Sequence, residues 1–259
     1  MQLQGSYTNG FGLHDKVVFI SGSTRGLGLE MASAMARSGA LVYINGRSDQ
    51  SVEQACEALR QTGTNVQGVV GDMSVVSDID RCMAYLAEQH GRCDVLVNNM
   101  GIRIRQPLAA FNFEQMERML QVNLLGAMYL SQKAAALMQK QQWGRLITIT
   151  SVAGQVARPG DGVYPIAKQG LTGMMRALAV EFAACGITSN AIAPGTFATE
   201  TNLEMVNSAA GQTLAARNPT GRWGRPEEIA GLAVFLASDL SAYINGQVIS
   251  VDGGLSVLF

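Results

Sequence analysis

The 259-residue sequence has little of what membrane and nucleic-acid-binding proteins require. No apolar run approaches the roughly eighteen residues that a membrane-spanning helix needs. Excess charge is also missing, because 19 Lys and Arg residues nearly balance 20 Asp and Glu residues and leave a formal net charge of −1. A chain without surplus positive charge has no electrostatic basis for binding nucleic acid or an anionic membrane surface. We therefore expect neither kind of partner.

Cysteine is scarce and scattered. The four cysteines lack the close spacing of metal ligands and lie in helical or strand patterns at Cys56, Cys82, Cys93 and Cys185. This arrangement predicts buried free thiols in a reducing compartment. Residues 1–14 also lack the basic and then apolar pattern of a secretion signal. We expect a cytoplasmic protein without a metal site.

Linkers, internal repeats and low-complexity tracts are missing as well, which predicts one domain over residues 1–259 with residues 1–12 as an N-terminal extension. The chain instead alternates between β-like and helical segments. Strands are expected at 17–20, 40–45, 66–70, 94–99, 145–151, 187–193 and 247–252, and helices at 74–90, 113–141, 163–184 and 226–237. This alternation predicts a doubly wound α/β fold, in which a parallel sheet carries helices on both faces.

The first expected strand leads directly into a glycine-rich turn. Helical periodicity follows this turn and ends at Gly39. Strand, turn and helix together form a phosphate cradle, because glycines let the backbone approach closely and the helix N-terminus offers free N–H groups. The spacing G-x-x-x-G-x-G differs from the usual G-x-G-x-x-G fingerprint. We interpret the turn as a site for a pyrophosphate-bearing cofactor, formed by Gly22, Ser23, Thr24, Arg25, Gly26, Leu27 and Gly28.

The end of the second expected strand lacks the acidic residue that would bind a ribose 2′-hydroxyl. The strand ends at Asn45, and Arg47 and Ser48 follow it. Arg47 and Arg25 could hold a 2′-phosphate through charge-assisted hydrogen bonds. The sequence therefore favours NADP(H) over NAD(H), although the nearby Asp49 leaves NAD(H) open.

Tyr164 and Lys168 share one face of an expected helix, thirteen residues after Ser151. An ammonium beside a phenol stabilises the phenolate and lowers a pKa that is normally about 10. A tyrosine tuned in this way can exchange a proton near neutral pH. The polar motifs fall at or just beyond the carboxyl ends of expected strands, where such sheets bind ligands.

These motifs together resemble the short-chain dehydrogenase/reductase family, from about Leu13 to the C-terminus. The matching elements, in the order and spacing of that family, are Gly22-x-x-x-Gly26-x-Gly28, Asn98-Asn99-Met100-Gly101, Asn123, Ser151, Tyr164-x-x-x-Lys168, Pro194-Gly195 and Asp252-Gly253-Gly254. The resemblance implies a single Rossmann-type domain with about seven parallel strands, and a homotetramer or homodimer. It also implies hydride exchange between a nicotinamide cofactor and an alcohol or carbonyl compound.

The resemblance also implies roles for the catalytic candidates. Tyr164 would protonate a carbonyl oxygen during reduction or deprotonate an alcohol during oxidation. Lys168 would assist Tyr164 and bind the nicotinamide ribose, and Ser151 would donate a hydrogen bond to the same substrate oxygen. Asn123 would hold a water in the proton relay, distort its own helix, or do both.

Further cofactor contacts follow from the same resemblance. They are Asp72 and Met73 near the adenine, Asn99 and Gly101 beside the cofactor or supporting the central strand, and Pro194, Gly195, Phe197 and Thr199 near the nicotinamide carboxamide. One departure stands out, because Met100 occupies a position where the family usually has alanine. Its thioether could narrow the space near the cofactor ribose or fill a gap.

The substrate loops at residues 101–107, 155–160 and 193–200 look most like the gluconate 5-dehydrogenase branch of the family. Arg103 and Arg158 could pair with the carboxylate of a sugar acid whose reacting oxygen meets Ser151 and Tyr164. The two arginines could also be solvated loop residues or subunit contacts.

Two other functions stay open at this point. One is a 3-oxoacyl-[carrier protein] reductase, or a reductase of another hydrophobic ketone, since Phe197 and Leu203 make the lid apolar. The other is a sensor or scaffold that binds NADPH without turnover, against which the complete Asn, Ser, Tyr and Lys set argues. Helical stretches at 116–139 and 171–184 are apolar on more than one side, so either a second subunit or neighbouring helices of the same chain must cover them. The family resemblance favours an oligomer, with a tetramer ahead of a dimer.

Overall fold

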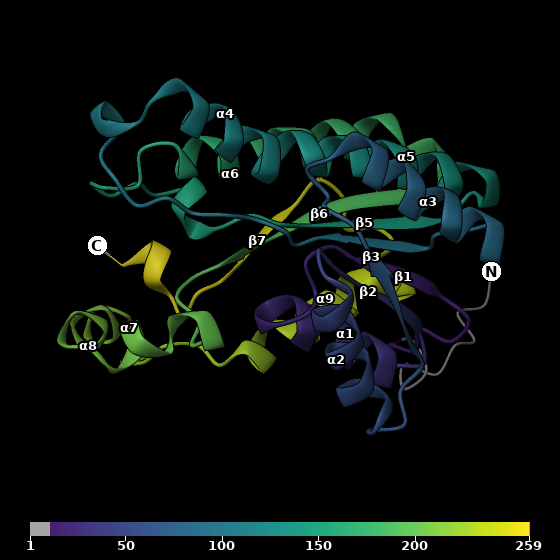
Figure 1. The fold of residues 1–259 in the computed structure, drawn as a ribbon, viewed down its shortest axis with the longest axis horizontal. Coiled ribbons are helices and arrows are strands. Elements are labelled where there is room, and N and C mark those ends of the chain that lie inside the picture. The colour runs from purple at the N-terminus through teal and green to yellow at the C-terminus, as the bar shows by residue number, and fades with distance from the viewer. Residues whose placement is uncertain (1–10, 259) are drawn as a thin grey trace.

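A seven-stranded parallel sheet with strand order β3-β2-β1-β4-β5-β6-β7 forms the centre of the computed structural model (Figure 1). The structure describes residues 11–258, so most of the expected N-terminal extension and Phe259 lie outside the described residues. The strands are β1 Val17–Ile20, β2 Leu41–Gly46, β3 Val66–Val70, β4 Val95–Asn98, β5 Gly144–Ile149, β6 Ile187–Pro194 and β7 Val248–Val251. The predicted doubly wound fold is confirmed.

The inner strands are apolar because both of their faces are covered. All residues of β1, β4, β5 and β6 are buried, as expected for parallel strands between two helical layers. Val18 of β1 pairs with Val42 of β2 on one side and with Val95 of β4 on the other. The strand order reverses at this point, because β2 and β3 lie on one side of β1 and the later strands on the other.

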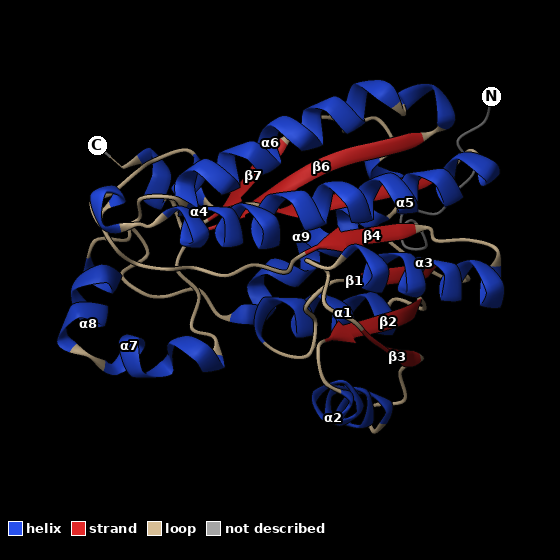
Figure 2. Cartoon of the chain, turned by 45° about the horizontal axis from the view of Figure 1, so that its top comes forward, coloured by secondary structure: helices blue, strands red, loops and turns tan. Residues whose placement is uncertain are grey.

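Helices cover both faces of the sheet, and α7 and α8 lie beyond the strand ends (Figure 1 and Figure 2). The helices are α1 Gly26–Arg37, α2 Asp49–Arg60, α3 Val76–His90, α4 Phe113–Leu120, α5 Gly126–Gln141, α6 Tyr164–Glu181, α7 Leu203–Asn207, α8 Ala209–Ala216 and α9 Ala230–Ala237. In Figure 1, α1, α2 and α9 lie below the sheet and α3 to α6 lie above it. Two separate apolar cores result, one on each face. Within residues 11–258, no helix is long and apolar enough to cross a membrane.

The elements differ from the sequence-based expectations in three places. The helix expected over residues 113–141 contains a π-helical turn at Gln121–Leu125, which separates α4 from α5. Helix α2 was not expected from the sequence, and Ser48 caps it by accepting a hydrogen bond from the backbone N–H of Ser51. The segment after β6, expected to form a lid, contains the short helices α7 and α8.

The carboxyl ends of the strands meet at one edge of the sheet. In Figure 2, the arrowheads of β2 and β4 point toward the side of the molecule where α7 and α8 lie. Ligands of open α/β sheets bind outside these strand ends, at the point where the strand order reverses. The fold therefore predicts a ligand site beyond the carboxyl ends of β1 and β4.

Candidate active site

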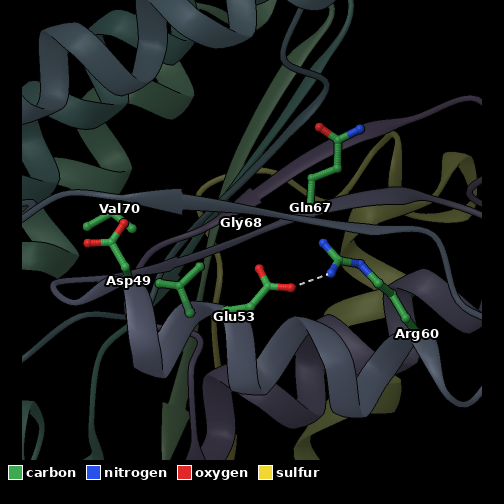
Figure 3. A pocket seen from close by; sticks show the side chains of 7 residues that line it. Asp49, Glu53, Arg60, Gln67, Gly68 and Val70 are labelled. Carbon is green, nitrogen blue, oxygen red and sulfur yellow. Dashed lines mark hydrogen bonds and ion pairs between the residues drawn. The ribbon is translucent and has the colours of Figure 1, made fainter.

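Two hollows on the surface of the described residues are candidates for a ligand site. The hollow in Figure 3 lies between α2 and β3, where the ion pair of Glu53 and Arg60 faces Gln67. None of the site residues predicted from the sequence lines it. The other hollow, a cleft of about 1170 Å³, opens at the carboxyl ends of the strands. It exceeds the ~300–1,000 Å³ of typical small-molecule sites, so there is room for a dinucleotide together with a small substrate.

Most of the predicted site residues line this cleft. They are Gly22, Thr24, Arg25, Gly26, Leu27, Gly28, Asn45, Arg47, Ser48, Asp72, Asn99, Gly101, Arg103, Ser151, Tyr164, Lys168, Pro194, Gly195, Phe197 and Thr199. Ser23, Met73 and Asn123 are buried behind the cleft wall, and Arg158 also does not line it. The proposed site roles of these four residues stay predictions.

The glycine-rich turn has the close backbone packing of a phosphate cradle. Gly22 and Gly26 adopt φ angles of 60° and 57°, in the left-handed region that favours glycine. A Cβ at Gly28 would lie 2.7 Å from the backbone oxygen of Gly22 and 2.5 Å from Nδ2 of Asn99. That Asn99 nitrogen donates hydrogen bonds to the backbone oxygens of Ser21 and Gly22, at 3.0 and 2.8 Å. These hydrogen bonds from Asn99 stabilise the conformation of the turn.

Ser23 shapes the same turn from inside the fold. Its hydroxyl donates to the backbone oxygen of Ile20 at 2.7 Å and accepts from the backbone N–H of Asn45 at 3.0 Å. At the start of α1, the backbone N–H of Gly26 donates to the carboxylate of Glu200 at 3.1 Å. A helix N-terminus that already holds a carboxylate oxygen fits the pyrophosphate of a dinucleotide. The cradle therefore suits the cofactor that the sequence predicts.

The part of the cleft beside the glycine-rich turn and the end of β2 carries two available guanidiniums. Arg25 and Arg47 line the cleft, and neither forms an ion pair within residues 11–258. Burial by itself would raise the pKa of Asp72, but hydrogen bonds from Ser74 and the charges of Arg118 and Arg47 outweigh burial and lower it. Asp72 is therefore an ionised hydrogen-bond acceptor in the cleft.

Tyr164, Lys168 and Ser151 come together at the middle of the cleft. Tyr164 is the first residue of α6, and Lys168 follows one turn later. Lys168 is only 4% exposed; its Nζ donates to the backbone oxygen of Ile149 at 2.8 Å and lies 5.7 Å from the centroid of the Tyr164 ring. Ser151 follows β5, and its hydroxyl accepts from the N–H of Ala153 at 3.1 Å. A phenol, an ammonium and a hydroxyl thus share one wall of the cleft.

Asn123 supports this wall from the π-helical turn. Its Oδ1 accepts from the N–H of Ile102 and its Nδ2 donates to the oxygen of Ile102, both at 2.9 Å. A Cβ at Gly101 would lie 2.7 Å from that Oδ1 and 3.6 Å from Nζ of Lys168. The side chain of Asn123 therefore fixes the loop after β4. Its role in a proton relay stays a prediction.

The arginines at the substrate end differ in their partners. Arg103 and Arg158 both bind the carboxylate of Asp161. Arg105 lines the cleft and has no hydrogen-bond or ion-pair partner within the described part of the chain. Burial is the main cause that lowers the pKa of Arg105, and the neighbouring guanidiniums of Arg103 and Arg158 lower it further. Arg105 is therefore the guanidinium that remains available to an anionic ligand.

The sequence reasoning missed Arg105 and Asp161 as site residues. Alternation in Ile102-Arg103-Ile104-Arg105 was an available signal for Arg105, because alternate residues of an extended segment share a side. The two isoleucines pack against a small apolar cluster, and both arginines line the cleft. No local pattern singles out Asp161.

Comparisons with known proteins agree with this geometry. Residues 22–256 match the family described as Enoyl-(Acyl carrier protein) reductase. The chain is 33% identical to gluconate 5-dehydrogenase of Gluconobacter oxydans, covering 97% of this chain and 99% of that protein. It is 34% identical to 3-oxoacyl-[acyl-carrier-protein] reductase of Synechocystis, covering 93% and 96%.

A solved structure is similar over the same length. It is a gluconate 5-dehydrogenase from Burkholderia cenocepacia in complex with NADP and tartrate, with 34% identity, a TM-score of 0.92, and coverage of 97% of this chain and 99% of that one. Fold, motif order and relatives agree over nearly the whole chain. The protein therefore belongs to the short-chain dehydrogenase/reductase family of oxidoreductases.

Proposed function

We propose that the protein transfers a hydride between NADP(H) and the secondary alcohol or ketone of a sugar acid. The observation that carries the substrate assignment is the available guanidinium of Arg105, which shares the cleft with Tyr164 and Ser151. A guanidinium without a protein partner suits a substrate carboxylate, which it can bind through two parallel hydrogen bonds. A relative that is a gluconate 5-dehydrogenase, and a similar structure that holds NADP and tartrate, support the proposal.

In this proposal, the residues of the chain handle the proton and position the oxygen. Bound nicotinamide would supply or accept the hydride. Tyr164 would give a proton to the substrate oxygen during reduction and take it during oxidation. Ser151 would donate a hydrogen bond to the same oxygen and stabilise its developing charge. Lys168, anchored by the backbone oxygen of Ile149, would place its positive charge beside Tyr164 and the ribose.

The preference for NADP(H) is proposed from Arg25 and Arg47. We expect Arg47→Asp to weaken NADPH binding by about 10–100-fold, the range for losing charge-assisted hydrogen bonds. NADH lacks the 2′-phosphate, so its affinity should change by no more than about twofold. Titration of both cofactors by intrinsic fluorescence measures the difference. Arg37→Asp, at the far end of α1, makes the same charge change outside the cleft and should alter neither affinity. Equal weakening of both cofactors by Arg47→Asp would refute the 2′-phosphate role.

The substrate class is tested through Arg105. Arg105→Gln should raise the KM for gluconate or 5-ketogluconate at least about tenfold, as expected for the loss of a charged hydrogen bond. The KM of an uncharged ketone of similar size should stay within about twofold, because it offers no carboxylate. Steady-state kinetics with both substrates separate the outcomes. A rise in KM for both substrates would mean that Arg105 shapes the cleft and does not bind a carboxylate.

A second candidate is reduction of a 3-oxoacyl thioester. The matching family description and the Synechocystis relative favour it, and buried Phe197 gives the cleft an apolar wall. A panel of gluconate with NADP+, and of 5-ketogluconate and acetoacetyl thioesters with NADPH, decides between the two. Turnover of the thioesters alone would replace the sugar-acid proposal.

We also propose that the chain assembles as a homotetramer or homodimer. Apolar side chains are exposed on the outer helices, including Phe113 of α4, which is 72% exposed, and Val180 of α6, which is 82% exposed. Contact with a second copy of the chain would cover these side chains. Light scattering in solution would report a monomer if the proposal is wrong.

A further inference from the structure

A buried carboxylate joins the two loops at the substrate end of the cleft. The side chain of Asp161 is 2% exposed and accepts hydrogen bonds from Nε of Arg103 at 3.0 Å, from a terminal nitrogen of Arg103, and from Nε of Arg158 at 2.8 Å. The backbone joins the same loops, because Asp161 forms a parallel bridge with Gln106 and the N–H of Gly162 donates to the Gln106 oxygen at 3.2 Å. Asp161 is therefore a fixed point between the loops.

Arg103 reaches from this fixed point to the predicted acid/base residue. The central carbon of its guanidinium lies 4.6 Å from the centroid of the Tyr164 ring. A guanidinium at this distance is attracted to the face of an aromatic ring. Charged groups near the ring include Arg103 and Arg105 of the loop after β4, Arg158 and Asp161 of the loop before α6, and Lys168 of α6. Helix α4 meets the same ring through an apolar cluster that contains Met116 and Met119.

We propose that Asp161 is a positioning residue that holds the Arg103 guanidinium over the Tyr164 ring and thereby favours the phenolate that takes a proton from an alcohol. This inference rests on the proposed acid/base role of Tyr164. Arg103 is thus assigned to Tyr164 and not to the substrate carboxylate, which is left to Arg105.

The arrangement needs a carboxylate for a simple electrostatic reason. Three guanidiniums, those of Arg103, Arg105 and Arg158, lie close enough to influence one another. Without a shared anion they would repel one another, and Arg103 would swing into solvent. Burial by itself would raise the pKa of Asp161, but hydrogen bonds and charge from Arg103 and Arg158 lower it. The carboxylate is therefore ionised at neutral pH and can pair with both guanidiniums.

The first test measures the protonation of Tyr164 without turnover. Absorbance near the phenolate band is titrated with pH in the protein and in its Tyr164→Phe counterpart, and the difference reports on Tyr164 alone. Arg103→Gln, introduced in both backgrounds, should move the midpoint of this difference upward by about half a unit to one unit, the size expected for removing a nearby positive charge. Arg60→Gln removes an ion-paired guanidinium from the hollow in Figure 3, which none of the predicted site residues lines, and should leave the midpoint in place.

The second test separates positioning from simple charge. Asp161→Asn, again introduced with and without Tyr164→Phe, removes a negative charge near the ring, which by itself would move the midpoint downward. If Asp161 acts by holding Arg103, the released guanidinium instead moves the midpoint upward, as Arg103→Gln does. A downward shift, or no shift with Arg103→Gln, overturns the proposal. Arg103→Gln alone decides the question if Asp161→Asn does not fold.

The outcome can be told apart from failure of the proposed function. Absence of turnover with every sugar acid, together with upward midpoints in both variants, defeats the substrate assignment and leaves the positioning role intact. Turnover of a sugar acid together with unmoved midpoints supports the substrate assignment and defeats the positioning role. Where the protein turns over a substrate, the pH of half-maximal kcat for alcohol oxidation should shift with the same sign in both variants.

Discussion

Replacement of Tyr164 by phenylalanine is expected to lower kcat by about 10²–10⁴-fold, the usual contribution of a positioned general acid or base. The ring stays in place and only the hydroxyl is lost, so the start of α6 and the contacts of Lys168 should survive. NADPH affinity is expected to change by less than about threefold, because the residues of the glycine-rich turn are unchanged. Stopped-flow absorbance at the nicotinamide band measures the chemical step directly.

A matched control is available on the neighbouring helix. Tyr129→Phe on α5 removes a hydroxyl that lies outside the cleft and donates to Asp80 of α3 at 2.9 Å. Its kcat should equal that of the unmodified protein. If Tyr164→Phe kept full activity, the proton would come from another group and the proposed mechanism would be wrong.

Gly28→Ala should weaken NADPH binding by about tenfold or more, as expected for the loss of one or two hydrogen bonds. The added methyl would lie 2.5 Å from Nδ2 of Asn99 and 2.7 Å from the backbone oxygen of Gly22. Asn99 would have to release the two backbone oxygens that it holds, and the turn would open. Overpacking of this kind should also lower the free energy of unfolding by about 1–3 kcal/mol. Calorimetry of cofactor binding and chemical denaturation measure the two effects.

Gly231→Ala is the matched control for this change. Gly231 lies in α9, and a Cβ there would meet nothing within 4 Å. Because alanine is the better helix former, this variant should be neutral or more stable by up to about 1 kcal/mol. Unchanged NADPH affinity in Gly28→Ala would show that the turn tolerates a side chain and that the cradle has been misread.

The strands could be predicted from the sequence because a buried strand has a recognisable local composition. Parallel strands covered on both faces read as short β-branched runs, and the expected ranges match the observed strands within two residues at each end. Helix α2 was missed, although Ser48 before Asp49 is a standard helix start. Helices α7 and α8 span five and eight residues, too short for a clear apolar stripe. The π-helical turn at Gln121–Leu125 interrupts an otherwise regular helical pattern, so periodicity alone did not reveal it.

The candidate site likewise contains residues that the sequence could place and residues that it could not. The cradle and the Tyr164–Lys168 pair depend on spacing along a single turn or helix, so the sequence predicted their placement. The arginines depend on distant partners: the loop that carries Arg103 meets Asp161 across 58 residues of sequence. From the sequence alone, Arg103 and Arg158 were candidates for substrate binding. The structure instead pairs both with Asp161 and leaves Arg105 available.

The linear order of residues was sufficient for the fold class, the family and the residues proposed for proton transfer. Each of these follows from short-range geometry: the period of a strand, the pitch of a helix, and the backbone freedom of glycine in a turn. Tertiary packing decided which charges neutralise one another and which remain available at the cleft. Electrostatic pairing depends on distance in space. The loop after β4 and the loop before α6 come close to each other only when the chain folds and brings α6 next to the end of β4.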